Sequence, residues 1–346
     1  MPAVSLKNIV RKYGEKKALD NVSFDCAENS RTVIIGPSGA GKTTCLKLIA
    51  GLETADEGSL YIDGRDASSL KPHERNIGMI FQDAALFPHS TVYDNIAYGM
   101  HRLGYNKDDI RKMVQETAEH LHIESLLKRY PGSLSAGERQ RAGIARAIVR
   151  KPGLLLLDEP FANLDARLRE ELQKEIISLQ KEYGMTMLLI THDQSEAVAM
   201  GQYLIFMEEG KVIDSGPVRK VAEDPRDLRS AMFIGSPAVN TSPVSETKDG
   251  PMFFGTILNV SLQGRNVIGA VRPEKMFLTE EGRGFACTVQ SVTHGYREST
   301  AECMSMYGPL RITGTDFAEK QILHVSFHEG DVMLFDAETK ERIRLM

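Results

Sequence analysis

The chain has 346 residues, of which 42% are hydrophobic, and a formal net charge of −5. This length predicts about two domains, and the hydrophobic content is sufficient to bury a core in each. The negative balance argues against a nucleic-acid partner held by phosphate neutralisation, and no apolar run approaches the roughly 20 residues of a membrane-spanning helix.

A glycine-rich segment follows the apolar run 32–35 and fits the pattern G-x-x-x-x-G-K-[ST]. Its glycines allow backbone N–H groups to face phosphate oxygens, Lys42 adds a positive charge near the β- and γ-phosphates, and the Thr43 hydroxyl can reach Mg²⁺. We expect a helix from Lys42 to Ala50 that directs its positive end at the phosphates. A glycine-rich turn that binds nothing is the alternative. The predicted nucleotide-binding residues of this segment are Gly36, Pro37, Ser38, Gly39, Ala40, Gly41, Lys42, Thr43 and Thr44.

The segments on either side of this helix predict β-structure, and helical patterns follow them. Alternating residues at 18–24 and 58–64 are typical of strands. Residues 108–121 and 123–128 are rich in helix formers.

The next informative segment is LSAGERQR at 134–141. Ser135 followed by Glu138 predicts a capping box that opens a helix running through Val149. A helix start with serine and glycine can also present N–H groups to an anion, so both interpretations remain open.

The apolar run 154–157 ends in Asp158 and Glu159. This pattern predicts a buried parallel strand that delivers two carboxylates to the carboxyl edge of a sheet. Leucine and isoleucine then recur at 168, 172, 176 and 179, which predicts a long helix with one face in the core. His192 follows another apolar run, 187–190, and a lone histidine is usually structural.

The strand-rich region 201–216 completes this first part, and the composition of the sequence changes near Gly235. Prolines at 237, 243 and 251 and the polar run 245–250 predict a linker. Short strand-like segments separated by glycines follow, which predicts an all-β barrel of the oligonucleotide/oligosaccharide-binding (OB) type. The expected domains are therefore 1–235 and 236–346. The expected strands of the second domain are 253–258, 267–271, 285–292, 301–307, 322–327 and 332–335.

Taken together, these motifs closely resemble, in type and order, those of the ATP-binding subunits of ATP-binding-cassette (ABC) transporters. The resemblance implies an α/β P-loop ATPase core with a helical subdomain at about 88–150, followed by a small all-β OB-like domain. The segments that carry it are the phosphate loop, Gln82 in 80–83, the signature segment 134–138, Asp158-Glu159, Asn163-Leu164-Asp165, and His192 in 191–193.

This resemblance implies a role for each site residue. Thr43, Gln82 and Asp158 would hold Mg²⁺, since a hard cation prefers oxygen ligands. Glu159 would be the base that polarises the attacking water, and His192 would contact the γ-phosphate. Tyr13 would stack on adenine, with an ordinary surface tyrosine as the alternative. With Lys42 and Gln82 added, the expected catalytic set is Glu159, His192, Lys42 and Gln82.

In this family the signature acts on the ATP of the opposite subunit. Here it consists of Ser135, Ala136, Gly137 and Glu138, with alanine and glutamate where glycine and glutamine are common. The backbone donors survive both changes, so we expect an active ATPase that binds ATP and Mg²⁺.

The C-terminal part is similar to the regulatory (TOBE-like) domain of maltose-type import ATPases in residues 271–274, 330–332 and 334–339. Residues 233–237 are similar to the junction of the sugar importers, although 238–241 depart from it. The resemblance implies an importer of a sugar or sugar phosphate. Importers of polyamines, ferric iron or oxyanions remain alternatives, as do a soluble ABC ATPase not coupled to transport and a regulator without turnover.

The partners implied by this resemblance are a second copy of the chain in an ATP-sandwich dimer, two transmembrane permease subunits and, indirectly, an external solute-binding protein. The expected location is peripheral, at the cytoplasmic face of the cell membrane, and the polar residues near the N-terminus are not typical of a secretory signal. The candidate contact with the membrane subunit, with buried core as the alternative, comprises Leu86, Phe87, Pro88 and Val92.

Overall fold

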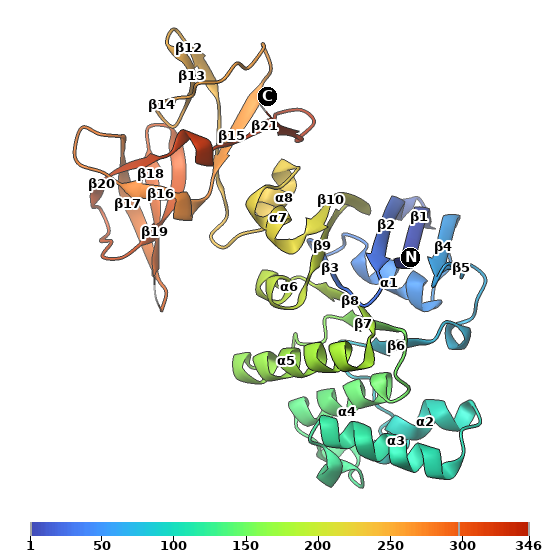
Figure 1. Ribbon diagram of the computed structural model, residues 1–346. Coiled ribbons are helices and arrows are strands. Elements are labelled where there is room, and N and C mark those ends of the chain that lie inside the picture. Colours follow the sequence, from blue (N-terminus) through green and yellow to red (C-terminus); the bar gives the residue numbers. More distant parts are fainter. Residues whose placement is uncertain (1, 297, 345–346) are drawn as a thin grey trace. The chain divides into compact units, whose positions relative to one another are not determined.

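The structure is a computed structural model that describes residues 2–296 and 298–344. The chain consists of two compact units, one ending at Val218 and the other beginning at Arg219. Each unit has its own sheets (Figure 1).

A six-stranded sheet forms the centre of the first unit. Its order is β10-β9-β3-β8-β7-β6, and all neighbours are parallel except the β9–β10 pair. Strands β3, β7 and β8 are buried along nearly their whole length, as expected for parallel strands. The strands are β3 (Arg31–Ile35), β6 (Ile77–Ile80), β7 (Leu154–Asp158), β8 (Thr186–Thr191), β9 (Tyr203–Glu208) and β10 (Lys211–Pro217).

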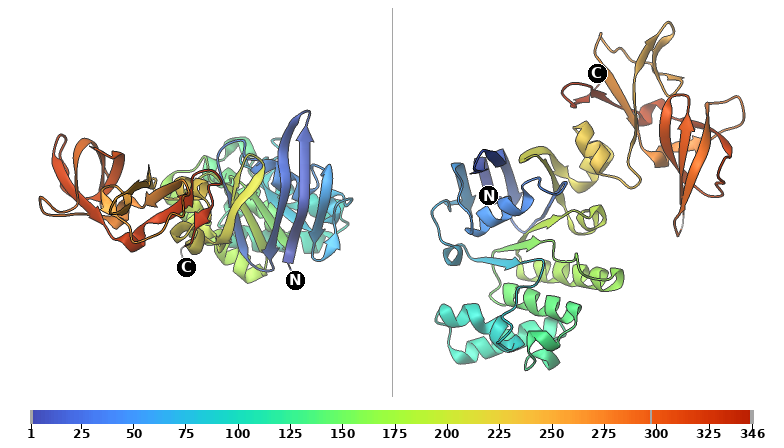
Figure 2. Two further views of the ribbon diagram at one scale, coloured as in Figure 1. Left: turned by 90° about the horizontal axis from the view of Figure 1, so that it is seen from above. Right: turned by 180° about the vertical axis from the view of Figure 1, so that it is seen from behind.

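A second, antiparallel sheet packs with it around α1 (Lys42–Ala50), whose bounds agree with the prediction. Its two longest strands, β1 and β2, run side by side (Figure 2). Apolar side chains from both sheets and α1, among them Leu6, Ile34, Leu46 and Leu188, form one core. The strands are β1 (Pro2–Tyr13), β2 (Lys16–Ala27), β4 (Glu57–Ile62) and β5 (Arg65–Asp66).

The expected helical part consists of α2 (Val92–Arg102), α3 (Lys107–His120) and α4 (Ala136–Ile148), which pack on one another. Residues 123–128 form only a short 3₁₀ turn at Glu124–Leu126 instead of a helix. The long helix after Asp165 is α5 (Ala166–Tyr183), and α6 (Gln194–Met200) follows β8.

The second unit is rich in strands, as the sequence predicts. A five-stranded antiparallel sheet, β16-β20-β17-β18-β19, lies in the same unit as sheets of four and three strands. The α/β core, the helical part and the all-β C-terminal part together confirm the expected fold class. The strands are β11 (Asn240–Pro243), β12 (Ser245–Thr247), β13 (Gly250–Phe253), β14 (Thr256–Ile257), β15 (Val267–Val271), β16 (Met276–Leu278), β17 (Phe285–His294), β18 (Ser299–Ser305), β19 (Gly308–Gly314), β20 (Ile322–Phe327), β21 (Met333–Asp336) and β22 (Arg342–Ile343).

The two units divide earlier in the chain than the expected boundary at 235/236, because α8 (Leu228–Phe233) belongs to the second unit. Leu228 and Ala231 share a buried apolar cluster with Ala270, Met333 and Phe335 of the strands and with Val239, which precedes β11. Arg272, which is buried, donates to the carbonyl oxygen of Ala222 at 2.8 Å and also to that of Ile234. These contacts join α7 (Val218–Glu223) and α8 to the second unit.

Replacing Arg272 by alanine is expected to destabilise the second unit by about 2–5 kcal/mol, because buried carbonyl groups would lose their donor. The measurement is urea unfolding followed by circular dichroism. Arg283→Ala is the matched control, since Arg283 is an exposed side chain paired only weakly with Glu280 at 3.9 Å. Equal unfolding midpoints for the two variants would contradict the assignment of Arg272 as the residue that holds α7 and α8.

None of the helices in the described part of the chain is long and apolar enough to cross a membrane.

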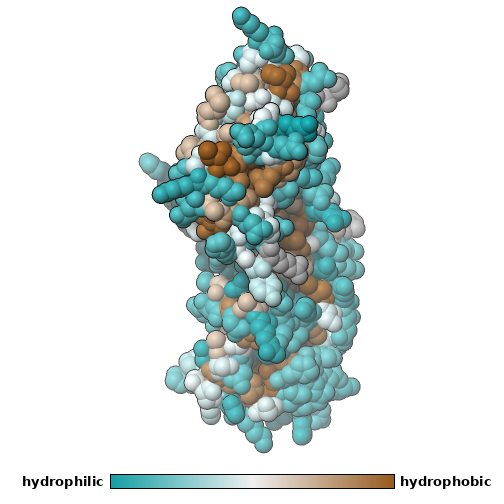
Figure 3. Space-filling model, turned by 90° about the vertical axis from the view of Figure 1, so that its left-hand side faces the viewer, coloured by the Kyte–Doolittle hydropathy of each residue, from teal (hydrophilic) through white to brown (hydrophobic). Residues whose placement is uncertain are grey.

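The face drawn in Figure 3 is mostly hydrophilic, and its apolar side chains lie in separate groups.

Candidate functional site

The phosphate loop lies between β3 and α1, with its backbone close to neighbouring strands. A Cβ atom on Gly41, whose φ is +96°, would lie 2.3 Å from the carbonyl oxygen of Ala18 in β2. A Cβ atom on Gly36 would lie 2.0 Å from the carbonyl oxygen of Met207 in β9. Glycine is therefore required at both positions, which fixes the path of the loop over the N-terminus of α1.

The ammonium group of Lys42 lies against this loop. It donates to the carbonyl oxygens of Gly36 at 2.8 Å and Pro37 at 2.9 Å. Burial lowers the pKa of Lys42, whereas the nearby carboxylates of Glu159 and Asp158 raise it. A positive charge next to a helix N-terminus suits an anionic ligand such as a phosphate.

Asp158 and Glu159 stand at the carboxyl edge of the central sheet, where β7 ends. Thr43 Oγ1 donates to Asp158 Oδ1 at 3.3 Å. Burial raises the pKa of Asp158, the hydrogen bond from Thr43 opposes this shift, and the Glu159 charge adds to it. A bound cation would favour the ionised carboxylate of Asp158.

Glu159 has a left-handed backbone conformation with φ +47°, which is uncommon for a residue other than glycine. Its N–H donates to the carbonyl oxygen of Ile190 at 3.0 Å, so the turn is anchored to β8. The side chain reaches His192, with Glu159 Oε2 and His192 Nδ1 separated by 3.1 Å. His192 is 61% exposed, which leaves it accessible to a ligand.

Thr43 and Asp158 fit a magnesium ion because both present oxygen atoms on one side of the loop. The described residues contain no group of three His, Cys, Asp or Glu side chains that could hold a metal. The expected magnesium ligands are Thr43, Gln82, Asp158 and phosphate oxygens, so they do not include three such side chains. Gln82 is exposed and follows β6, which pairs in parallel with β7 through Ile80 and Leu157, so it stands at the same edge.

Tyr13 is the last residue of β1 and is 47% exposed. The guanidinium of Arg11 lies 4.9 Å from the centre of its ring. Tyr13 is therefore an exposed side chain at the end of the antiparallel sheet with Arg11 beside its ring, and its stacking on adenine stays a prediction.

The signature segment opens α4 with the predicted capping box. Glu138 N donates to Ser135 Oγ at 3.3 Å, and Ser135 N donates to Glu138 Oε2 at 2.8 Å. This backbone hydrogen bond lowers the pKa of Glu138. The carboxylate thus bonds to its own helix. A Cβ atom on Gly137 would lie 2.3 Å from Leu168 Cδ2, so the start of α4 packs closely on α5. Figure 1 shows α4 beside α2 and α3, apart from α1.

The segment after Gln82 is held by two side chains. Arg146 of α4 donates to the carbonyl oxygens of Ala84 at 2.9 Å and Ala85 at 2.7 Å. Asn95, which is buried, accepts from Phe87 N at 2.7 Å and donates to Phe87 O at 3.1 Å. Of the proposed contact residues, Leu86 is half-buried and Phe87 and Pro88 are exposed, whereas Val92 is fully buried core. The expectation for Val92 is therefore wrong, because it starts α2 with its side chain turned inward.

Sequence reasoning missed a network around the His192 turn. Thr191 Oγ1 donates to Glu196 Oε2 at 2.6 Å, and Arg169 of α5 donates to Asp193 Oδ2 at 3.2 Å. Asp193 also caps α6 by accepting from Ser195 N at 2.8 Å. The Asp-x-x-Glu spacing at the start of α6 was a signal for the cap, but nothing local identified Arg169.

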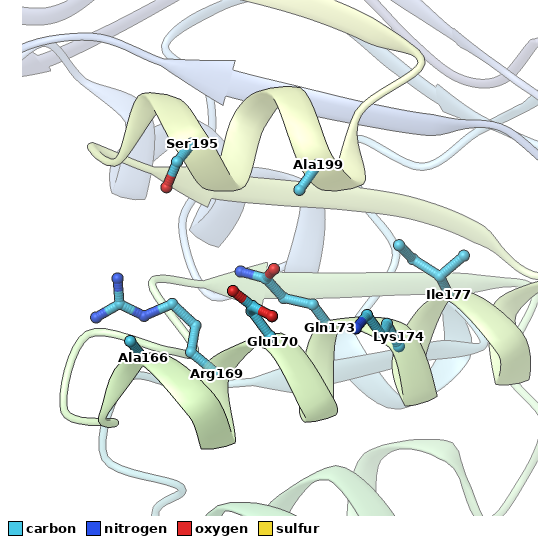
Figure 4. Close-up of a pocket in the computed structure, with 8 residues that line it drawn as sticks. All are labelled: Ala166, Arg169, Glu170, Gln173, Lys174, Ile177, Ser195 and Ala199. Atoms are coloured by element: carbon cyan, nitrogen blue, oxygen red, sulfur yellow. The ribbon is translucent and has the colours of Figure 1, made fainter. Parts of the chain in front are cut away.

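A pocket of about 410 Å³ lies beside this network, between α5 and α6 (Figure 4). It contains none of the predicted nucleotide or metal residues. The residues that line it are Ala166, Arg169, Glu170, Gln173, Lys174, Ile177, Ser195 and Ala199.

This fold and site define a P-loop nucleotide-binding cassette: a phosphate loop, two carboxylates and a histidine gathered at one sheet edge.

Comparison with known proteins narrows this class. Residues 19–162 match the ABC transporter family. The chain is 40% identical over 292 residues to the sn-glycerol-3-phosphate import ATP-binding protein UgpC of Bordetella pertussis, covering 82% of this chain and 81% of the relative. It is 35% identical over 376 residues to the diacetylchitobiose uptake system ATP-binding protein MsiK of Streptomyces coelicolor, covering 99% of this chain and 100% of the relative.

A solved structure, the dimeric post-hydrolysis state of the ATP-binding cassette MJ0796 bound to ADP and Pi, is also similar. It is 31% identical with a TM-score of 0.57, covering 62% of this chain and 99% of that one. The chain therefore belongs to the ABC transporter family, which confirms the family expected from the motifs.

Proposed function

We propose that this chain hydrolyses ATP to energise the import of a sugar or sugar phosphate through membrane permease subunits. The observation that carries the proposal is the meeting of Lys42, Thr43, Asp158, Glu159 and His192 at one sheet edge. The relatives UgpC and MsiK, which are import ATP-binding proteins by name, support the same role.

The phosphates bind the backbone N–H groups at the start of α1 and the ammonium of Lys42. Thr43, Asp158 and the side-chain oxygen of Gln82 hold Mg²⁺, which neutralises phosphate charge when bound. Glu159 accepts a hydrogen bond from the attacking water and takes its proton. His192, held 3.1 Å from Glu159, orients that carboxylate and contacts the γ-phosphate. Tyr13 stacks on the adenine.

Two copies of the chain close around two ATP molecules. Within one chain Ser135, Ala136, Gly137 and Glu138 open α4, away from α1, which supports the inference that a second copy supplies the signature to each phosphate loop. The dimeric state of the MJ0796 cassette supports this arrangement. With its carboxylate bonded to Ser135 N, Glu138 does not turn toward the anion.

The permease subunits dock on the segment after Gln82. Phe87 is 40% exposed and its ring lies 4.6 Å from that of Tyr98, which is also exposed. Leu86 and Pro88 extend this apolar surface, and the contact keeps the chain peripheral at the cytoplasmic face of the membrane. An external solute-binding protein delivers the solute to the permease.

The test is uptake in a strain that lacks the gene, with labelled glycerol 3-phosphate, diacetylchitobiose, maltose, a polyamine, ferric iron and sulfate. We expect the strain to lose uptake of one sugar or sugar phosphate. The wild-type chain should restore this uptake, and Glu159→Gln should not. Loss of polyamine, iron or sulfate uptake would overturn the solute class but leave the importer role. Turnover of ATP by the purified chain tests hydrolysis separately.

A further inference from the structure

Arg169 of α5 connects two segments that flank the candidate active site. Its guanidinium donates to Asp193 Oδ2 at 3.2 Å and to the carbonyl oxygen of Leu164 at 3.2 Å. Its Nε atom is buried and lies 3.7 Å from Glu196 Oε1. Leu164 immediately precedes the cap of α5, and Asp193 immediately follows His192, so one side chain sets the separation of the two segments.

Asp193 and Glu196, which face the guanidinium of Arg169, also form the hydrogen bonds that hold the turn carrying His192. Asp193 Oδ1 accepts from Ser195 N at 2.8 Å and from Ser195 Oγ at 2.6 Å. Glu196, whose side chain is only 4% exposed, accepts from Thr191 Oγ1 at 2.6 Å. The hydroxyl of Thr191 in turn accepts from Asp193 N at 2.9 Å. The backbone on both sides of His192 therefore depends on Asp193 and Glu196.

The guanidinium of Arg169 compensates the negative charges of Asp193 and Glu196. Burial raises the pKa of Glu196, and the nearby Asp193 charge adds to the shift, whereas Arg169 lowers it. Without the guanidinium, Asp193 would lose a hydrogen-bond donor and Glu196 a neighbouring positive charge, so the turn would lose the contact that fixes it to α5. A small displacement of a group in contact with the reacting phosphate has a large effect on rate.

We propose that Arg169 is a positioning residue for hydrolysis: it holds the His192 turn in place beside Glu159 and ties that turn to the Leu164–Asp165 segment. The inference rests on the proposed ATPase function. Arg169 is not one of the predicted nucleotide-binding residues and contacts Asp193, Leu164 and Glu196 instead, so its effect falls on turnover and spares ATP binding.

The pocket between α5 and α6 provides a specific test, because Arg169 forms part of its wall (Figure 4). Truncating the side chain would extend the pocket of about 410 Å³ toward Asp193 and Glu196. A small guanidinium ion from solvent can then occupy the place of the lost group between the same carboxylates. Gln173 and Ser195, which also line the pocket, are polar and suit a hydrated path for the ion.

The experiment measures steady-state ATP hydrolysis by the purified full chain. We expect Arg169→Ala to lower kcat by about 10- to 100-fold, the effect of losing hydrogen bonds to charged groups, with KM for ATP changed less than about twofold. Arg169→Lys should recover part of kcat. Ethylguanidinium should raise kcat of Arg169→Ala at concentrations that leave the wild type unchanged, and ethylurea, which is neutral, should not.

Arg167→Ala is the matched control. Arg167 lies two residues earlier on the same helix, is 91% exposed and pairs with Glu171 at 3.1 Å, so its loss should leave kcat unchanged. An unchanged kcat in Arg169→Ala would overturn the inference, as would a loss that ethylguanidinium does not relieve. If Arg169→Ala does not fold, Asp193→Asn tests the same ion pair, and wild-type kcat in that variant would overturn it. Turnover by the wild type and by Arg167→Ala tests the proposed function independently.

Discussion

Replacing Glu159 by glutamine is expected to lower kcat for ATP hydrolysis by about 100- to 10,000-fold while ATP still binds, because the amide cannot take a proton from water. Glutamine has the same shape, so the contact with His192, now 3.1 Å, can persist. The phosphate loop and Lys42 remain unchanged. The variant should therefore accumulate as an ATP-bound dimer, which size-exclusion chromatography with ATP and Mg²⁺ would detect.

The matched control for this change is Glu171→Gln. Glu171 is an exposed glutamate on α5 that pairs with Arg167 at 3.1 Å, and its neutralisation should leave kcat within about twofold of the wild type because exposed ion pairs contribute little. If Glu159→Gln kept more than about a tenth of wild-type kcat, another group would be the base, since general-base catalysis is worth more than that.

Replacing Gly41 by alanine is expected to abolish ATP binding. The new methyl group would lie 2.3 Å from the carbonyl oxygen of Ala18 and 3.1 Å from Leu19 Cδ2, and φ at this position is +96°. Overpacking costs about 1–3 kcal/mol, and a left-handed conformation adds roughly 1–2 kcal/mol. The loop can relieve this strain only by moving its N–H groups away from the phosphates. Binding of a fluorescent ATP analogue measures the effect.

Gly104→Ala separates the collision from the general effect of alanine in a left-handed conformation. Gly104 has φ +78° and open space around its Cβ position, in the loop between α2 and α3. We expect this control to bind the analogue as the wild type does, with only a slightly lower unfolding temperature. Normal binding by Gly41→Ala would mean that the loop tolerates the methyl group and that its path is not fixed by Ala18.

The parts of the molecule that the sequence predicts well are those whose cause is local. The helix from Lys42 to Ala50, the strand ending in Asp158 and the capping box of Ser135 and Glu138 each depend on residues within a few positions. Strands β15 and β20 of the second unit follow from alternation and glycine in the same way, whereas the expected strand 253–258 contains the turn between β13 and β14. The family motifs predict that Thr43, Asp158, Glu159 and His192 lie in one site. In the structure Thr43 contacts Asp158, and Glu159 contacts His192.

The features that escaped prediction depend on contacts between distant residues. An arginine such as Arg169 has no local pattern that separates it from the exposed Arg167, because its role comes from Asp193 and Glu196 after another strand. Val92 looks as apolar as Phe87, and only the packing of α2 decides which of them is buried. The division of contacts between Val218 and Arg219 likewise has no local signal, since the change of composition comes later, near Gly235.

The packing of α8 against β15 and β21 has a consequence for gene fusions and domain exchange. A chimaera joined at residue 235 would separate Leu228 and Ala231 from Ala270 and Phe335, so neither parent's apolar cluster would be complete. A crossover between Val218 and Arg219 exchanges that cluster whole, together with Arg272 and the carbonyl groups it binds. Functional hybrids between this chain and its relatives should therefore share breakpoints ahead of α8.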